Sequence, residues 1–206
     1  MEPVTRISER AVAIDQVNVN TDQIFPARFL KNPRSVGYAQ FLFHDLRFDE
    51  TGAPRPEFPL NHPAAEGANI IVSDLNFGCG SSREGAVYAL VDAGFRCLIA
   101  PSFGDIFAAN CVKNGLLPVV LPAETCAALR AELKRSNGAP VSIDLPAQTV
   151  EGPSGDRWHF DIDPFAKHCL VQGLDEIGVT LESVAEIDAF ERNWRLETPW
   201  LETGHR

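Results

Sequence analysis

The middle of the chain alternates between two hydrophobic periods. Short apolar runs predict three strands, over residues 69–73, 95–100 and 116–121. Apolar residues at every third or fourth position predict a helix after each strand, over residues 83–93, 102–114 and 123–135. A crossover helix carries the chain back to the same edge of a sheet, so strands joined in this way are parallel. The pattern therefore predicts a βαβαβ unit followed by one further helix.

Turn residues mark where these helices begin and end. Gly94 and Gly115 are expected to end the first two helices, because glycine readily takes the left-handed conformation of a helix C-terminus. Ser102, with Asp105 three residues later, is expected to cap the second helix.

The two ends of the chain follow other patterns. Beyond the turn at Asn137-Gly138, short strands are expected over 141–145, 148–151 and 158–162, the last two joined as a hairpin through 152–156. Helical spacing returns over 163–172 and 181–194. Up to Leu60 turn signals interrupt short apolar pieces, which predicts loops with short helical or strand elements. Long loops of this kind often carry binding groups.

These elements predict an α/β fold with a central, mostly parallel sheet flanked by helices and a small antiparallel β excursion. We expect one domain over 1–206. Its parts are a loop region at 1–60, the βαβαβ unit at 69–135, the β excursion at 139–162 and C-terminal helices at 163–206.

Composition and charge exclude some classes of function. The 206 residues are 45% hydrophobic and 22% charged, as in an ordinary globular protein, and carry a net charge of −10. Nucleic acid binding is not expected, because a polyanion partner requires a basic face. No apolar run reaches the roughly 18 residues of a membrane span, and the first ten residues lack a signal-peptide core, so a cytoplasmic protein is expected.

The five cysteines do not indicate a metal site or a disulfide framework. Cys79, Cys97, Cys111, Cys126 and Cys169 are odd in number and have no close pairing. A metal or cluster used by the chemistry is therefore expected mainly from another source.

The richest candidate chemistry lies in residues 74–84, between a predicted strand and a predicted helix. Ligands of open α/β sheets bind at such turns, because the helix N-terminus offers free N–H groups and a partial positive charge. Gly78 and Gly80 would let the backbone approach a ligand, and Arg83 supplies a forked cation for a carboxylate or phosphate. The alternative is that Ser-Ser-Arg-Glu is only a capping box. A complete dinucleotide fingerprint or P-loop is absent from the sequence.

Several long motifs in order resemble a known family. They are Asn-Phe-Gly-Cys-Gly-Ser-Ser-Arg-Glu at 76–84, Ala-Pro-Ser-Phe at 100–103, the run at 110–118, the run at 20–31 that resembles the family's N-terminal substrate loop, Phe-Asp-Ile-Asp-Pro-Phe at 160–165 and Gly-Leu-Asp-Glu-Ile-Gly at 173–178. Together they closely resemble the small-subunit family of 3-isopropylmalate dehydratases, over nearly the full chain.

This resemblance implies a fold, a partner and a reaction. The fold would be the swivelling β/β/α domain of the aconitase superfamily. The chain would work with a large subunit that carries a 4Fe-4S cluster, bind no cofactor itself, and take a small dicarboxylate as substrate. The paired subunits would act as a hydro-lyase that isomerises 2-isopropylmalate and 3-isopropylmalate by dehydration and rehydration, in leucine biosynthesis.

The resemblance also assigns roles to residues. Ser81 would be the catalytic base, acting as an alkoxide that takes a proton from carbon, while Ser82 and Arg83 bind a substrate carboxylate. Arg28 on the early loop would be a second carboxylate clamp. Other residues are expected to shape the loops of the site, namely Thr21, Asp22, Lys31, Gly78 and Gly80.

One departure from the family leaves alternatives open. After Ser-Ser-Arg-Glu the family usually continues His-Ala-Pro-Trp, whereas this chain has Gly85-Ala86-Val87-Tyr88. Glycine removes a hydrogen-bonding ring and loosens a helix by roughly 1 kcal/mol relative to alanine. One alternative is a paralogue that acts on another alkylmalate, and another is a non-catalytic anion-binding module. A third is a stand-alone hydrolase with Cys79 as nucleophile, since thiol pKa values fall at helix N-termini.

Overall fold

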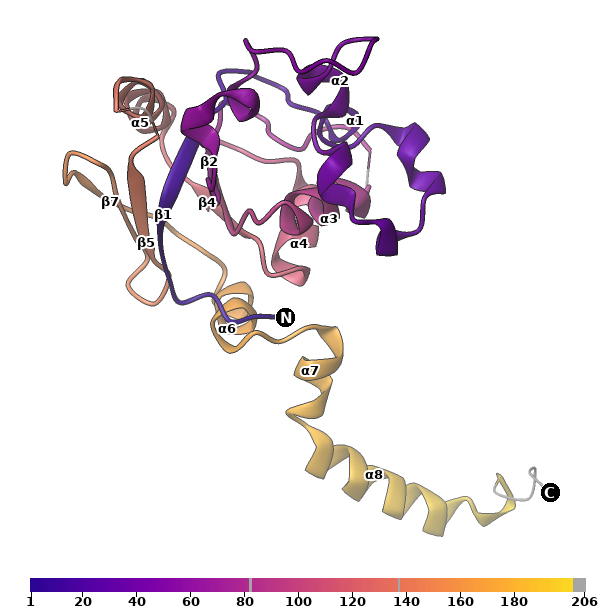
Figure 1. The fold of residues 1–206 in the computed structure, drawn as a ribbon. Coiled ribbons are helices and arrows are strands. Elements are labelled where there is room, and N and C mark those ends of the chain that lie inside the picture. The colour runs from indigo at the N-terminus through magenta and orange to yellow at the C-terminus, as the bar shows by residue number, and fades with distance from the viewer. Residues whose placement is uncertain (82, 137, 202–206) are drawn as a thin grey trace.

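A seven-stranded sheet, in the order β4-β3-β2-β1-β5-β6-β7, runs through the molecule (Figure 1). The computed structural model describes residues 1–81, 83–136 and 138–201; Ser82, Asn137 and the last five residues, His205 among them, lie outside the described residues. The strands are β1 (Arg6–Ala13), β2 (Ile70–Val72), β3 (Cys97–Ala100), β4 (Leu117–Val120), β5 (Pro140–Asp144), β6 (Thr149–Glu151) and β7 (Arg157–His159).

The predicted βαβαβ unit and its further helix are confirmed. Strands β1 to β4 pair in parallel, with Ile71 of β2 opposite Leu98 of β3. The connecting helices are α3 (Glu84–Asp92), α4 (Asp105–Lys113) and α5 (Ala123–Arg135). The three predicted C-terminal strands also form, each within two or three residues of its expected bounds, and pair antiparallel as β5, β6 and β7. An α/β fold with a mixed sheet results.

The expectation of loops and short elements in the first 60 residues is wrong for β1. This eight-residue strand lies at the centre of the sheet, parallel to β2 on one side and antiparallel to β5 on the other. The rest of this region matches the expectation, because it contains only short helices: α1 (Thr21–Ile24), α2 (His44–Arg47) and the 3₁₀ turns η1 (Ala27–Lys31), η2 (Arg34–Val36), η3 (Tyr38–Phe41), η4 (Pro59–Asn61) and η5 (Pro63–Ala65).

Two helix boundaries differ from the sequence prediction. Helix α4 begins after Gly104 and not at Ser102, whose hydroxyl instead accepts a hydrogen bond from the backbone of Asn76 at 2.9 Å. The helix expected over 181–194 is α8 (Val184–Glu197), which begins and ends three residues later, and an unpredicted short helix, α7 (Glu176–Leu181), precedes it across the turn at 182–183. Helix α6 (Pro164–Gln172) forms as expected and is capped by Asp163, whose side chain accepts from the backbone N–H groups of residues 165 and 166.

Both faces of the sheet are buried, which holds the carboxyl ends of its strands in fixed places. One face packs Ile71 and Leu98 against α3 and the aromatic side chains of the early loops. The other packs Ile70, Ile99 and their neighbours against α5 and α6. Strands covered on both sides are continuously apolar, as the short runs of the sequence predicted.

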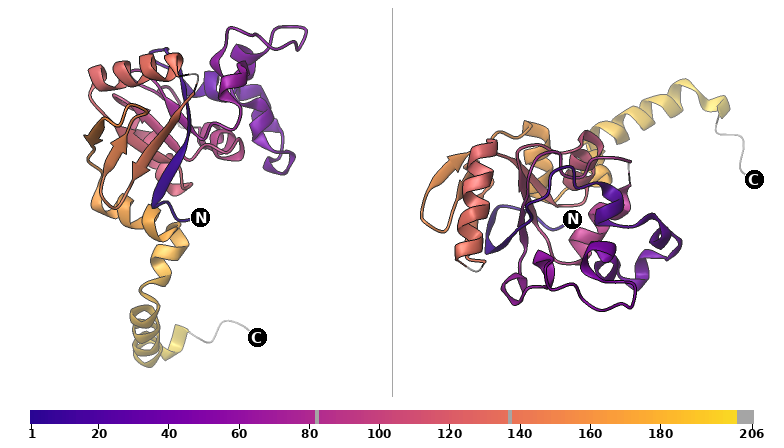
Figure 2. Two further views of the ribbon diagram at one scale, coloured as in Figure 1. Left: turned by 60° about the vertical axis from the view of Figure 1, so that its left-hand side comes forward. Right: turned by 90° about the horizontal axis from the view of Figure 1, so that it is seen from above.

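The C-terminal helices leave this body. Figures 1 and 2 show α8 extending away from the sheet and its covering helices, beyond α6 and α7. A last 3₁₀ turn, η6, spans Pro199–Leu201. In the described part of the chain, none of the helices combines the length and the apolar character needed to cross a membrane.

Candidate functional site

The turn from β2 to α3 lies between two neighbouring loops at the carboxyl ends of the parallel strands. On one side, Gly78 donates to the carbonyl of Val19 at 2.7 Å and Thr21 donates to that of Cys79 at 2.9 Å, through backbone N–H groups. On the other side, the backbone of Phe77 pairs with the loop after β3, donating to Ser102 at 3.0 Å. Segments that are far apart in the sequence therefore fix the turn.

The two glycines of the turn have the left-handed backbone that their residue type permits. Gly78 has φ +73° and Gly80 has φ +95°. A Cβ at Gly78 would lie 2.2 Å from Cγ of Phe107, whereas a Cβ at Gly80 would meet its nearest atom at 3.6 Å. Gly78 is thus required for both conformation and space, and Gly80 for conformation alone.

Ser81 is exposed at the end of this turn and lies beside Thr21. The Thr21 hydroxyl donates to the Ser81 carbonyl at 3.0 Å, and the two hydroxyl oxygens are 3.4 Å apart. Thr21 is buried, at 2% exposure, so it holds a fixed position against an exposed partner. This contact places a hydroxyl group next to the predicted base.

Arg83 forms an ion pair with Asp22, the neighbour of Thr21. Its side chain is about one quarter exposed, and Asp22 also accepts from the backbone of Ala27 at 3.2 Å. Arg83 is the N-cap of α3 but makes no capping bond with its side chain. Because α3 begins after Arg83, Ser81 and Glu84 do not take the N-cap and N3 positions of the capping-box alternative, and the N-terminus of α3 favours an anion near this cation.

Arg28 and Lys31 lie on η1, and both are exposed. The Arg28 guanidinium binds both carboxylate oxygens of Asp45, one at 2.6 Å, and stacks over the Phe29 ring at 4.4 Å. The ion pair raises the pKa of Arg28 and holds the pKa of Asp45 below its usual range. The structure thus brings together Thr21, Asp22, Ser81 and Arg83, while Arg28 has its own counterion. Ser82 lies outside the described residues.

Arg130, which the sequence reasoning missed, joins the roots of the two loops that carry these residues. From α5, its guanidinium donates to Asp15 Oδ1 at 2.9 Å, to the Ser73 carbonyl at 2.6 Å and to Asp74 Oδ2 at 2.6 Å. Only 6% of Arg130 is exposed. Asp15 follows β1 and Asp74 follows β2, so one buried cation fixes both strand ends. The sequence signal for this contact is an aspartate two residues after each of the two strands.

Gly85, the residue that departs from the family pattern, is enclosed. It is buried in the first turn of α3, and a Cβ there would lie 3.2 Å from Leu30 and 3.3 Å from the Phe25 ring. The early loop therefore occupies the space that a larger side chain at position 85 would need.

The cysteines differ in their exposure. Cys97, Cys111, Cys126 and Cys169 are buried, and Cys79 is half-buried. In residues 1–81, 83–136 and 138–201, no hydrogen bond joins the Cys79 thiol to a histidine or carboxylate, which gives the hydrolase alternative no base. The same residues contain no group of three or more His, Cys, Asp or Glu that could hold a metal ion.

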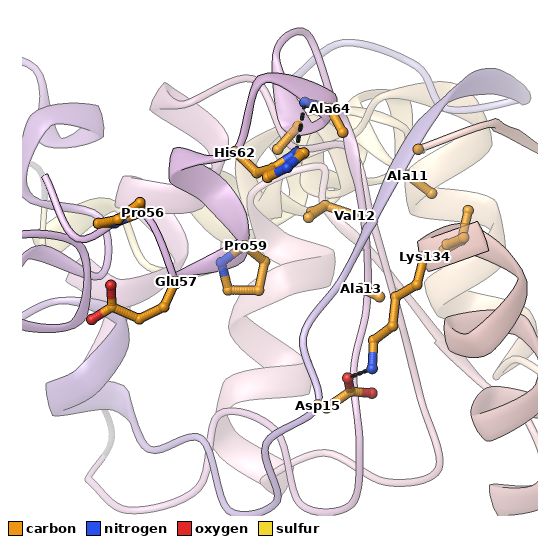
Figure 3. A pocket seen from close by; sticks show the side chains of 13 residues that line it. Ala11, Val12, Ala13, Asp15, Pro56, Glu57, Pro59, His62, Ala64 and Lys134 are labelled. Atoms are coloured by element: carbon orange, nitrogen blue, oxygen red, sulfur yellow. Dashed lines mark hydrogen bonds and ion pairs between the residues drawn. The ribbon is translucent and has the colours of Figure 1, made fainter. Parts of the chain in front are cut away.

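Two cavities lie elsewhere. One, of about 250 Å³, lies beside β1 and is lined by Ala11–Ala13, His62 and the Asp15–Lys134 ion pair, among others (Figure 3). The other, of about 300 Å³, is an apolar groove between α4, α6 and α7. Neither of these two cavities is lined by Ser81 or Arg83, and Ser81 itself is exposed.

Comparisons with known proteins agree with this geometry. Residues 1–124 match the family model of the aconitase C-terminal domain, which covers more than half of the chain. Residues 127–164 match a model described as LeuD_N, and residues 176–204 match the model for the C-terminal domain of the 3-isopropylmalate dehydratase small subunit.

Individual relatives extend over the full chain. The chain is 50% identical to the 3-isopropylmalate dehydratase small subunit of Phenylobacterium zucineum, over 98% of this chain and 99% of that protein. It is 47% identical to the small subunit of Dinoroseobacter shibae, over 98% and 100%. A solved structure of 3-isopropylmalate dehydratase from Methanocaldococcus jannaschii superposes with a TM-score of 0.64 at 25% identity, over 90% of this chain and 99% of that one.

Proposed function

Because this chain belongs to the family of 3-isopropylmalate dehydratase small subunits, we propose that it forms a hydro-lyase with a large subunit. The proposed reaction is the interconversion of 2-isopropylmalate and 3-isopropylmalate in leucine biosynthesis, in the cytoplasm. The observation that carries the proposal is the cluster of Ser81, Arg83, Thr21 and Asp22 at the start of α3. The exposure of Ser81 supports a site that a second subunit completes.

Ser81 is the proposed base. Its hydroxyl oxygen takes the proton from the substrate carbon and returns it when water is added back. An alkoxide needs nearby positive charge or hydrogen-bond donors. Ser81 precedes the N-terminus of α3 and is two residues from the Arg83 cation, and the Thr21 hydroxyl, 3.4 Å away, would have to turn its proton from the Ser81 carbonyl to the alkoxide.

Arg83 and Ser82 are the proposed partners of a substrate carboxylate. Arg83 is already held by Asp22, so a carboxylate ligand would share or replace that counterion. Arg28 is the proposed second clamp, and it would have to exchange Asp45 for the substrate. Gly78 and Gly80 give the turn its shape, and Lys31 lies on the exposed loop beside it.

The 4Fe-4S cluster belongs, in this proposal, to the large subunit. The described residues of this chain do not fit a cluster, because four of the five cysteines are buried and no set of metal ligands converges. What this chain contributes is therefore the proton transfer and the binding of the dicarboxylate.

A second candidate substrate follows from Gly85. Leu30 and the buried Phe25 fill the space beside it, so the surroundings of position 85 are aliphatic and aromatic at a place where the family usually carries an imidazole. We propose that this region lies next to the substrate. A differently alkylated malate is the alternative that this wall favours.

The first test is the ultraviolet absorbance of the unsaturated intermediate, with the chain mixed anaerobically with a cluster-loaded large subunit and 3-isopropylmalate. We expect a signal that Ser81→Ala lowers at least 100-fold. A signal only with another alkylmalate would support the second candidate. No signal with any of them would contradict both and leave a non-catalytic anion-binding module.

A further inference from the structure

The C-terminal arm, which we define as residues 176–201, carries an unusual share of the exposed apolar surface. Fifteen large hydrophobic side chains are exposed in the described residues, and eight of them lie in this arm. Phe190 is 68% exposed, Leu196 80% and Trp200 66%. Water-exposed aromatic groups at this density are typical of an interaction surface.

Part of this apolar surface forms a continuous stripe. On α8, Ile187, Phe190 and Trp194 follow one another at spacings of three and four, which places them on one side of the helix. At the root of the arm, the apolar groove between α4, α6 and α7 is lined by Phe165 and Val179 and lies next to the exposed Ile177. The surface thus begins on the body and continues along the arm.

The charge of the arm indicates what can cover it. The arm has six carboxylate side chains and only two arginines, Arg192 and Arg195. A second copy of this chain would bring the same excess of carboxylates and a net charge of −10, so self-association is opposed by repulsion. The complementary surface is an apolar groove with a lysine- and arginine-rich rim.

The arm and the catalytic turn lie at opposite ends of β1. The start of β1 is fixed beside α6, where Val4 donates to the Leu170 carbonyl at 2.8 Å. The loop that carries Thr21 follows the other end of this strand. The eight residues of β1 separate its two ends by about 26 Å. Figure 1 shows the arm leaving from the α6 end. The root of the arm lies nearer to the turn, because Glu176 pairs with Lys113 and the neighbouring Asn114 donates to Glu84 at 3.0 Å. A partner can therefore hold α8, the outer part of the arm, without covering Ser81.

We propose that the arm docks into a basic-rimmed apolar groove on the large subunit, and that it contributes affinity between subunits and not chemistry. The proposal rests on the function proposed above, which supplies the partner. Holding the subunits together at a distance from the site raises the local concentration of the body without fixing its orientation.

The test titrates the cluster-loaded large subunit into a fixed amount of this chain, and follows both the Kd by sedimentation and the rate of dehydration. The variant Phe190→Asp/Trp194→Asp places carboxylates in the stripe. Its matched control, Ala185→Asp/Asn193→Asp, adds the same charge to other exposed positions of α8. We expect the first variant to raise the Kd and the half-saturating concentration at least tenfold, with the plateau rate within twofold of wild type. The control should change neither the Kd nor the half-saturating concentration by more than about threefold.

Three outcomes would overturn the proposal. They are an unchanged Kd in the stripe variant, an equal rise in the control, and a wild-type chain that forms dimers which the stripe variant abolishes. A lowered plateau rate in the stripe variant would overturn it as well, because the arm would then act in the chemistry. Failure of the proposed function is a separate result, since the Kd is measured without turnover: the wild-type pair would bind but give no dehydration.

Discussion

At the residue scale, the two glycines of the turn between β2 and α3 are required for different reasons. Gly78 and Gly80 both have positive φ, but only Gly78 has a side chain, that of Phe107, where a Cβ would stand. Substituting Gly80 therefore measures the cost of a strained backbone alone, whereas substituting Gly78 adds the cost of a steric clash.

We predict that Gly80→Ala destabilises the chain by about 1 kcal/mol, the cost of a left-handed alanine. Gly78→Ala should cost at least about 3 kcal/mol, because it adds a contact with a packed ring at 2.2 Å. Urea unfolding of the two variants measures both values. Equal losses would mean that Phe107 moves aside without cost.

Gly85 gives a second prediction at this scale. Gly85→Ala should change the free energy of unfolding by less than about 1 kcal/mol, because the gain in helix propensity offsets contacts at 3.2–3.3 Å with Leu30 and Phe25. Gly85→His should displace the early loop and raise the KM of the reconstituted enzyme at least fivefold. A histidine variant with an unchanged KM would show that this loop does not form the pocket wall.

The site shows what local sequence can predict about residues. The glycines, Ser81 and Arg83 are recognisable because the turn, its hydroxyl groups and its cation lie in one short stretch. The contacts of Ser81 with Thr21 and of Arg83 with Asp22 join residues about sixty positions apart. They depend on the parallel pairing of β1 with β2, which no local pattern reveals.

At the element scale, α5 is tied to the two site loops through a buried cation. The Arg130 guanidinium donates to three acceptors on the segments that follow β1 and β2, namely Asp15, the Ser73 carbonyl and Asp74. The position of α5 and that of the site loops are therefore coupled.

We predict that Arg130→Met costs about 2 kcal/mol of stability, because it leaves the Asp74 carboxylate and the buried Ser73 carbonyl without this donor, while Asp15 keeps its second ion pair, with Lys134. In the reconstituted enzyme it should lower kcat more than it raises KM, since the loops lose their relative position. Arg130→Lys should restore part of the stability but little of kcat, because lysine lacks the fork. Arg135→Met, an exposed change on the same helix, is the control and should alter neither quantity.

The central strand was the element that sequence analysis missed. Residues Arg6–Ala13 place Arg6, Glu9 and Arg10 among apolar positions, so neither a continuous run nor a clean alternation is present. The first part of the strand is half-exposed against β5, and only its last three residues are fully covered beside β2. The βαβαβ unit was predictable because its strands are buried on both faces and its helices are local.

At the scale of the whole molecule, the buried thiols make stability depend on alkaline pH. Burial raises the pKa of Cys126 to about 11, and it raises the pKa of Cys97 and Cys111 as well. In the unfolded chain a thiol ionises near pH 8.5. A group whose pKa is raised on folding adds stability below its unfolded pKa and loses it as the pH rises toward the folded value.

We therefore predict that the free energy of unfolding falls steadily between about pH 8.5 and pH 11 under reducing conditions. Cys126→Ala should lower the overall stability but make this fall less steep, by up to about 1.4 kcal/mol per pH unit. Denaturant titrations at four pH values compare the slopes. Parallel slopes for the wild type and the variant would contradict a role for this thiol.

The position of β1 in the sheet has a consequence for synthesis on the ribosome. Its first residues pair with β5, and Arg6 binds Asp144, 138 positions later. The strand that emerges first can thus complete its pairing only after most of the chain has been made, and until then it exposes an unpaired edge. Expression conditions that slow elongation lengthen this exposure, so yield should depend on chaperones that shield nascent strands more than on the stability of the finished protein.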